Sequence, residues 1–358
     1  SSFSLRHPIC SICTMNREPH YTIHLLLDSR TLGGIETHVL QLAKGLQKMG
    51  HHPRVVFLTD YGPHPLQRLL QQADIQYCTL GGSFTALWRH LHQSSSILLH
   101  THGYKAGIMG RIAARLLHLP VLSTFHAGEI PKGRLALYDW IDRHSAPLAH
   151  QRFCVSQEIA TRLSTHADVM DNFVETHSLA SSQGEEIAFV GRLSREKGAD
   201  RFLQLAALFP KQRFHIYGEG PLRTSLERDA SNNIHFHGQQ TGMERVWPRI
   251  GLLLMPSRHE GLPMAALEAM ARGIPVLASA VGALDQLINH NQNGWLTPSG
   301  DLKQIRTHLQ QWISLPAQQK STLQEEARNT IEQRFSTQVA IPKLIAHYQQ
   351  AVAICNAE

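Results

Sequence analysis

The chain has 358 residues, of which 42% are hydrophobic and 17% are charged, and it carries a formal net charge of +6. A chain of this length exceeds one compact core and favours two domains, while no apolar run reaches the roughly 20 residues that cross a bilayer. The basic residues are dispersed and no motif of a nucleic-acid reader is present. We therefore expect nucleotide phosphates or acidic lipid as partners, and not nucleic acid.

The first residues are predicted to lie outside the folded domains. Met15 begins a run that reads as a natural start, and the stretch before it lacks the apolar core of a signal peptide. Cys10 and Cys13 form the only C-x-x-C, without a second pair to complete a zinc site. We expect residues 1–14 to be a disordered leader or an added extension, on a reduced, cytoplasmic protein.

Strand-like and helix-like runs alternate through the first half of the chain. Strands are predicted at 21–27, 54–59, 75–80, 97–101, 121–124 and 152–156, and helices at 36–50, 65–73, 85–92 and 107–117. This alternation is typical of βαβ units that form a mostly parallel sheet. A polar stretch without clear periodicity, near 158–184, predicts a linker.

The alternation restarts after the linker. Strands are predicted at 186–190, 214–217, 234–237, 252–255 and 274–277, helices at 199–209, near 222–229 and from Pro263 to Gly273, and a helical region at 302–335 and 339–355. The fold class is therefore α/β, with two doubly wound, Rossmann-like halves and a crevice between them. We assign 15–170 to the N-terminal domain and 171–337 to the C-terminal domain.

Two glutamates eight residues apart form the first candidate site. Glu260 falls in the loop after strand 252–255, and Glu268 in the second turn of the next helix. Both are expected to point into the crevice from different depths. The helix start between them is a predicted anion site, because its amides and dipole favour negative charge. This site comprises Gly261, Leu262, Pro263 and Met264.

A second anion site is predicted in the loop GRLSREKG at 191–198. This loop also follows a strand, and it offers Arg192 and Lys197 as cations. Either residue alone is more often a solvated surface group. Both in one loop, at the same sheet edge as the glutamate pair, predict a clamp for a diphosphate.

With these residues the sequence resembles the retaining glycosyltransferases of family 4, which have the GT-B fold. The resemblance covers about 21–355 and rests on E-x7-E within SRHEGLPMAALEAMARGIPVLAS. Four further motifs match in order, namely GGIETHV at 33–39, STFHAGE at 123–129, FVGRLSREKG at 189–198 and IYGEGP at 216–221.

The resemblance implies roles for residues of the C-terminal half. Glu268 would bind the nucleotide ribose hydroxyls, and Glu260 would contact hydroxyls of the donor sugar. Arg192 and Lys197 would neutralise the diphosphate as it leaves. Gly218, in the IYGEGP motif, would lie near the nucleotide.

The resemblance also assigns residues of the N-terminal half. His126 would lie at the donor sugar near the reacting centre, and Gly33 and Gly34 would let the backbone approach the diphosphate or sugar. The last segment, 338–358, would cross back as a helix onto the N-terminal domain. The implied catalytic set is His126, Glu260, Arg192 and Lys197.

Several residues at the predicted crevice are left with two interpretations. His100 and His102 end the strand at 97–101, and His102 is either an acceptor-side residue or an ordinary buried histidine. Glu36 and Lys105 are further candidates at the crevice edge. The helix at 107–117, with Lys105, Arg111 and Arg115 on its polar side, either lies on anionic lipid or packs on its sheet with a solvated face.

The implied activity is retaining transfer of a sugar from a nucleotide-diphosphate donor, UDP-linked by preference and GDP-linked as the alternative. The acceptor would be a sugar or a lipid-linked sugar in surface polysaccharide or glycolipid biosynthesis, at the inner face of the membrane if lipid is contacted. No cofactor or metal is expected, because the metal-binding Asp-x-Asp of GT-A enzymes is missing. The alternatives are a nucleotide-sugar epimerase on this fold and a non-catalytic nucleotide-sugar-binding subunit.

Overall fold

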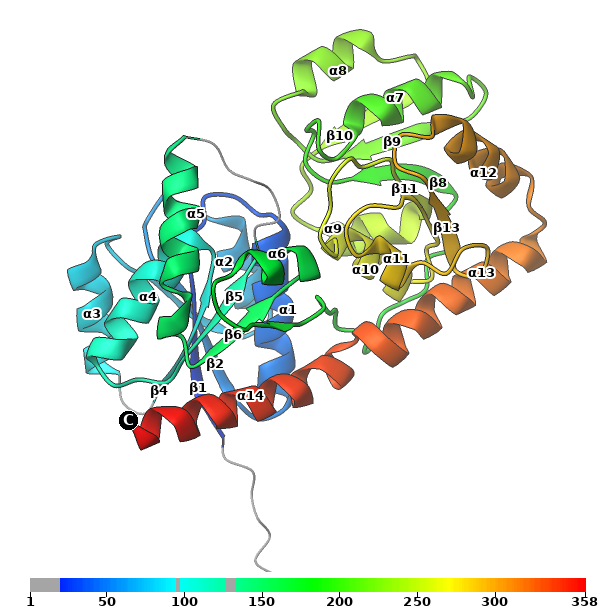
Figure 1. Ribbon diagram of the computed structural model, residues 1–358. Helices are drawn as coiled ribbons and strands as arrows, with labels where there is room; N and C mark the ends of the chain where they lie inside the picture. The colour runs from blue at the N-terminus through cyan, green and yellow to red at the C-terminus, as the bar shows by residue number, and fades with distance from the viewer. Residues whose placement is uncertain (1–19, 95–96, 127–132) are drawn as a thin grey trace, which may run out of the picture.

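The computed structural model describes residues 20–94, 97–126 and 133–358 of the chain. The predicted leader at 1–14 and the last three residues of the STFHAGE motif lie outside the described residues. Figure 1 shows two α/β bodies side by side, each with a sheet between layers of helices. Among the described helices, none combines the length and apolar character that a membrane span requires.

The N-terminal sheet has seven strands in the order β3-β2-β1-β4-β5-β6-β7, and all of its pairs are parallel. The strands are β1 Thr22–Leu27, β2 His52–Phe57, β3 Gln76–Thr79, β4 Ile97–His102, β5 Val121–Phe125, β6 Gln151–Cys154 and β7 Asp168–Val169. The helices are α1 Gly34–Lys48, α2 Pro65–Gln72, α3 Phe84–Gln93, α4 Tyr104–Leu116, α5 Arg134–His144 and α6 Gln157–Arg162, with a 3-10 turn at Ala146–Leu148. The strand order reverses between β1 and β4, where doubly wound folds place their ligands.

The C-terminal sheet has six parallel strands in the order β10-β9-β8-β11-β12-β13. They are β8 Glu186–Val190, β9 Phe214–Tyr217, β10 Ile234–Gly238, β11 Ile250–Met255, β12 Val276–Ser279 and β13 Gly294–Thr297. The helices are α7 Ala199–Ala207, α8 Arg223–Asp229, α9 Met243–Val246, α10 Met264–Ala271, α11 Leu284–Leu287, α12 Leu302–Ser314, α13 Ala317–Thr330 and α14 Thr337–Ala357, with short turns of helix at Trp247–Arg249 and Ile331–Phe335. The two doubly wound parallel sheets confirm the predicted fold class.

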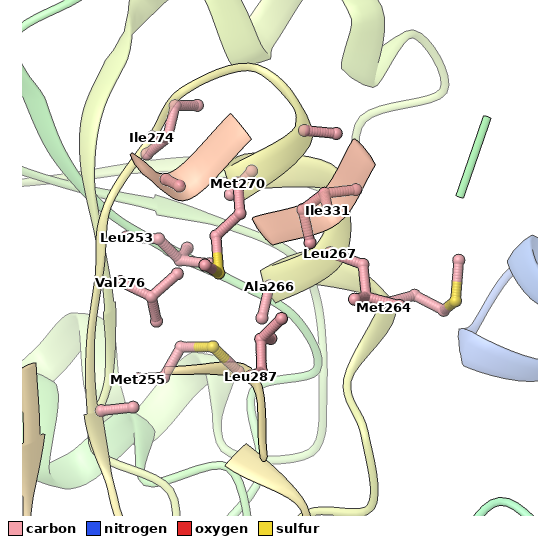
Figure 2. Close-up of a cluster of buried hydrophobic side chains, with 14 of the residues drawn as sticks. Leu253, Met255, Met264, Ala266, Leu267, Met270, Ile274, Val276, Leu287 and Ile331 are labelled. Carbon is pink, nitrogen blue, oxygen red and sulfur yellow. The ribbon is translucent and has the colours of Figure 1, made fainter. Parts of the chain in front are cut away.

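Helix α10 is fixed by an apolar core on most of its sides. Met264, Leu267 and Met270 belong to a buried cluster that also holds Leu253 of β11 and Val276 of β12 (Figure 2). A helix that is apolar nearly all round must be buried. Its start, at the carboxyl end of β11, is therefore held rigidly at the sheet edge.

Three elements between β5 and β8 are missing from the sequence-based prediction, namely α5, α6 and β7. Helix α5 lacks ordinary amphipathic periodicity because its carboxylates face inward: Asp139 and Asp142 are buried, while Leu137 and Trp140 are 59% and 51% exposed. Helix α6 and strand β7 are too short to give a periodic signal.

The polar face predicted for the helix at 107–117 needs a correction. Arg111 of α4 is 1% exposed and donates to Asp142 of α5 at 2.6 Å and to Ser123 at 3.0 Å. It therefore joins α4 to α5 and to the sheet. Burial raises the pKa of the Asp142 carboxyl to about 6, opposed by the charge of Arg111. Lys105 donates to Thr59 at 3.0 Å.

Helix α14 returns to the N-terminal domain, along which it runs in Figure 1. Ile341, Leu344 and Tyr348 are buried in the same apolar cluster as residues of β1, β2 and α1. The crossing starts where Val174 and Ser336 form a parallel β-bridge, beside the interdomain segment. The last helix of the chain thus completes the core of the first domain.

The contact between α1 and α14 depends on a glycine. A Cβ placed on Gly45 of α1 would lie 2.7 Å from Cγ1 of the buried Ile341. We expect Gly45→Ala to lower the free energy of unfolding by about 1–2 kcal/mol, because overpacking outweighs the gain in helix propensity. Urea titration followed by circular dichroism measures the change.

Gly34→Ala in the same helix is the matched control, since a Cβ there meets no atom within 4 Å. Its stability should equal or slightly exceed that of the wild type. A Gly45→Ala variant as stable as the Gly34→Ala variant would show that α14 does not press on α1 at this point.

Candidate active site

Glu260 and Lys197 form an ion pair at the carboxyl edge of the C-terminal sheet. The Lys197 ammonium donates to Oε2 of Glu260 at 2.6 Å, and the Ser257 hydroxyl donates to Oε1 at 2.8 Å. The Glu260 side chain is 2% exposed and that of Lys197 is 34% exposed. The pair therefore keeps one face of the cation open while the carboxylate is almost out of water.

A second ion pair locks the same two loops together. The Arg258 guanidinium donates to both carboxylate oxygens of Asp200 at 2.7 Å, and the Arg258 amide donates to the Glu196 carbonyl at 2.7 Å. A bidentate pair of this kind fixes geometry as well as charge. Sequence reasoning missed both residues. In the sequence they could have been recognised as an arginine just before Glu260 and an aspartate just after the loop at 191–198.

Two glycines allow these loops to approach one another. Gly198, with φ of 73°, would place a Cβ 2.1 Å from the Pro256 carbonyl oxygen. Gly218, with φ of 147°, would place one 1.8 Å from the Gly191 carbonyl oxygen. Loop packing therefore explains Gly218 without a ligand.

The start of α10 presents backbone amides beside the ion pair. Pro263 is the N-cap residue and has no amide hydrogen, so it cannot contribute a donor to the predicted anion site. The remaining amides of Gly261, Leu262 and Met264 keep that role. Arg192 is exposed and, within the part of the chain that the structure describes, has no carboxylate within 4 Å.

Glu268 lies farther along α10, where the two domains meet. Burial raises the pKa of its carboxyl, and the charges of Arg272 and of Lys44 on α1 oppose that shift. Burial in turn lowers the pKa of Lys44. The two glutamates thus lie in different environments. Glu260 pairs with a lysine of its own domain, whereas Glu268 faces a lysine of the N-terminal domain.

One hydrogen bond joins the interdomain segment to the α10 loop. Asn172 is 8% exposed and donates from Nδ2 to the Leu262 carbonyl at 2.7 Å. A Cβ placed on Gly261 would lie 4.0 Å from Val155 of the N-terminal domain. The predicted anion site therefore lies directly against the first domain.

The start of α1 bears the two glycines that the sequence singled out. The Gly33 amide donates to Oε2 of Glu36 at 2.8 Å, which caps the helix. Gly34 faces open space. Glu36 therefore has a structural task at the helix start, and the space beside Gly34 is compatible with close approach of a ligand.

Four histidines gather at the carboxyl edge of the N-terminal sheet. His102 Nδ1 lies 3.0 Å from His126 Nε2, and the rings of His100 and His102 lie 4.4 Å apart. His38 of α1 contacts both His102 and His126. Burial lowers the pKa of His38 to about 4 and of His100 to about 3, and it lowers those of His102 and His126 well below the usual value.

These rings include a set that could hold a metal ion. One ring nitrogen each of His38, His102 and His126 lies within 4.8 Å of the others. Neutral imidazoles suit Zn²⁺ and similar ions. The short contact between His102 and His126 already satisfies one nitrogen of each ring, and a metal would have to replace that hydrogen bond.

Two family models match the chain across these sites. Glycosyltransferase Family 4 matches residues 32–175, and Glycosyl transferases group 1 matches residues 175–330. The crystal structure of Anabaena Alr3699/HepE in complex with UDP-glucose has a TM-score of 0.75 at 20% identity, and the match covers 95% of this chain and 100% of that one. Each domain thus matches a glycosyltransferase model, and the chain is a glycosyltransferase with the GT-B fold.

Two curated relatives of this glycosyltransferase come from Escherichia coli. UDP-Gal:alpha-D-GlcNAc-diphosphoundecaprenol alpha-1,3-galactosyltransferase is 26% identical over 260 residues, which are 62% of this chain and 67% of that protein. Putative colanic acid biosynthesis glycosyltransferase WcaL, of strain K12, is 28% identical over 184 residues. That second match spans 47% of this chain and only 45% of the relative.

The structure brings the predicted residues of this glycosyltransferase together in two groups. Glu260, Lys197 and the amides at the start of α10 are adjacent in the C-terminal domain. His126 lies among other histidines in the N-terminal domain, where His38 was not singled out by the sequence. Its signal was a histidine inside the GGIETHV motif, which only the folded α1 turns towards β4 and β5.

The buried histidines predict an acid-sensitive fold. Burial lowers the pKa of His24 to about 4, as it does for His38, and that of His100 to about 3. The unfolded chain takes up protons below about pH 6.5, which the folded chain excludes until about pH 4, so stability falls as pH falls through this window. Within this window, each such histidine lowers the free energy of unfolding by about 1.4 kcal/mol for every unit by which the pH falls. Asp142 and Glu268, whose pKa values are raised, oppose the trend.

We expect a lower urea midpoint at pH 5.5 than at pH 7.5. His24→Phe removes one titrating group remote from the site, so its stability should depend less steeply on pH, whatever its midpoint at pH 7.5. An equal pH dependence in both proteins would show that His24 titrates normally in the folded state.

Proposed function

We propose that this glycosyltransferase moves a sugar, with retention of configuration and without a metal, from a nucleotide-diphosphate donor to a sugar or lipid-linked sugar acceptor. The pathway would be surface polysaccharide or glycolipid biosynthesis, which agrees with the activities for which the two relatives are named. The observation that carries the proposal is the partly open Lys197 cation beside the free amides of the α10 start. Epimerisation and a purely binding role are not favoured, because the relatives are named as transferases.

The donor diphosphate is assigned to the edge of the C-terminal sheet. Arg192 and Lys197 would supply charge, and the amides of Gly261, Leu262 and Met264 would supply directed hydrogen bonds. Leaving of the diphosphate builds negative charge, which these fixed groups stabilise without rearrangement. The ion pair with Glu260 positions Lys197 before the donor arrives.

The donor sugar and nucleoside are assigned to the residues around this clamp. Glu260 would turn a carboxylate oxygen to the sugar hydroxyls, and Glu268 would bind the ribose hydroxyls. Gly33 and Gly34 would close on the donor from the first domain. We favour UDP because the Anabaena protein of the same fold is described with UDP-glucose. A GDP-sugar is the alternative.

In transfer with retention, the acceptor hydroxyl would attack the anomeric carbon of the donor sugar from the same face that the diphosphate leaves. The leaving phosphate would take the acceptor proton, so no protein nucleophile is needed. His126 would contact the donor sugar as a neutral ring, because its pKa is far below the usual value. It then supplies a hydrogen bond and not a charge.

A small cavity beside His126 supports an acceptor position in the first domain. It has a volume of about 110 Å³, and its walls include Ile35, Phe125 and Ile159. Asp142 and Arg143 of α5 also line it. The lining therefore combines apolar and charged side chains, as suits a sugar carried on an amphiphile.

Membrane contact is assigned to the outer face of α5. Leu137, Tyr138 and Trp140 are exposed there, and the neighbouring α4 exposes Leu116. The acidic residues of α5 point inward, so Arg134 at its start is left to face an anionic surface. Apolar side chains beside a cation favour anionic lipid. We propose on this basis that the protein binds a membrane surface, and we expect this to be the cytoplasmic face.

Substitutions at Glu268 and His126 should separate binding from transfer. We expect Glu268→Ala to raise the Kd for UDP about 10- to 100-fold, because charged hydrogen bonds to ribose are lost. His126→Ala should lower kcat by about 100-fold or more while the Kd stays within a few fold. Calorimetry with UDP, GDP and ADP measures the Kd. The release of nucleotide in the presence of acceptor and EDTA measures kcat.

Arg245→Ala, a charge substitution on α9 outside the clamp, is the control for general loss of charge. Binding of no nucleotide would refute the diphosphate clamp. Activity abolished by EDTA and restored by Zn²⁺ would refute metal independence and would point to the three histidines. Tight binding of GDP and not UDP would reassign the base.

The α5 face can be tested with vesicles. Wild-type protein should sediment with phosphatidylcholine vesicles that contain phosphatidylglycerol, and less with phosphatidylcholine alone. The double variant Leu137→Asp and Trp140→Asp should bind about tenfold more weakly or worse, because two apolar side chains no longer enter the lipid.

Leu208→Asp provides the matched control, since Leu208 is an exposed leucine of the C-terminal domain. It should bind vesicles like the wild type. Equal loss in the control, or no vesicle binding by the wild type, would refute the α5 surface and leave the nucleotide measurements unaffected.

A further inference from the structure

The contact between His102 and His126 can hold only one proton. His102 Nδ1 and His126 Nε2 are 3.0 Å apart, and both rings are neutral near pH 7 because burial lowers their pKa values far below it. A neutral imidazole has one N–H and one acceptor nitrogen. The hydrogen bond therefore links the tautomers of the two rings, and there are two ways to place the protons.

The first arrangement has His126 as the donor. His102 must then bear its own proton on Nε2. That atom is buried and has no hydrogen-bond partner among the described residues. An N–H group would be left without an acceptor in the interior, which is costly and rare in folded proteins.

The second arrangement has His102 as the donor. Its Nδ1–H points to His126 Nε2, and the buried Nε2 of His102 carries only a lone pair. His126 then holds its proton on Nδ1. His126 is the more exposed of the two rings and lines the cavity beside α5, so its N–H can reach a ligand or water.

The surroundings of His102 hold its ring in this orientation. His102 is 1% exposed at the end of β4, and the His100 ring lies 4.4 Å from its own. His100 is fixed in turn at both nitrogens, by Tyr348 of α14 at 2.8 Å and by Thr124 of β5 at 2.7 Å. A ring flip of His102 would have to displace these neighbours.

We propose that His102 is a positioning residue that fixes the tautomer of His126, so that His126 presents its Nδ1–H to an oxygen of the substrate. The role rests on the proposed function, because it assumes that His126 contacts the substrate. His126 then acts as a hydrogen-bond donor of fixed direction, and His102 need not touch the substrate at all.

The tautomer can be measured without activity. In protein labelled with ¹⁵N-histidine, the long-range ¹H–¹⁵N couplings of the His126 ring, assigned by comparison with His126→Ala, should report a proton on Nδ1. In His102→Phe, which keeps a ring but removes the donor, this pattern should be lost. A proton on Nε2 of His126 in the wild type would overturn the proposal.

Kinetics provide the second readout. We expect His102→Phe to lower kcat about 10- to 100-fold with little change in the Kd for nucleotide, as for residues that act by orienting another. His102→Asn should recover most of kcat, because its amide N–H can stand where Nδ1–H stood. An unchanged kcat in His102→Phe, or no recovery in His102→Asn, would overturn the positioning role.

His24→Phe is the matched control, since His24 is another buried histidine that contacts a second one, His90, at 3.2 Å. It should keep the wild-type kcat and the wild-type tautomer of His126. Inactive wild-type protein that binds no nucleotide would count against the proposed function, whereas the tautomer measurement would still decide the role of His102.

Discussion

The ion pair between Lys197 and Glu260 is the constraint on which the donor side of this glycosyltransferase depends. The carboxylate is almost fully buried, so removing its cation would leave an uncompensated charge, which costs several kcal/mol. Arg258 and Asp200 tie the same two loops a few residues away. The proposed diphosphate site thus has its cation held in place by an internal anion before any ligand binds.

The two domains differ in the polar groups that they place at their proposed sites. The C-terminal domain uses full charges in pairs, at a sheet edge where one partner remains open to water. The N-terminal domain gathers four imidazoles in a buried cluster, where desolvation keeps them neutral. This division matches the proposed reaction, in which charge develops on the leaving diphosphate while the sugar is oriented by hydrogen bonds.

The sequence sufficed for most strands of the two sheets because these buried strands and their flanking helices have strong periodicity, whereas the short edge strands β7 and β13 were not predicted. The prediction failed for α5, because this helix buries carboxylates, paired with Arg111 and Arg143, and exposes apolar side chains. The prediction also placed Arg111 on a solvated face, because the sequence of one helix does not indicate whether a charged residue pairs with a residue of another element. Predicting the pairing of Arg258 with Asp200 required knowing that two distant loops meet at glycines.

The position of α14 affects how this chain can fold during synthesis. Ile341, Leu344 and Tyr348 belong to the core of the first domain but follow the whole second domain in the sequence. The first domain therefore cannot complete its core, and leaves apolar residues beside α1 uncovered, until α14 has left the ribosome. The second domain, by contrast, holds its own apolar clusters from β8 to the turn before α14, and can complete them earlier.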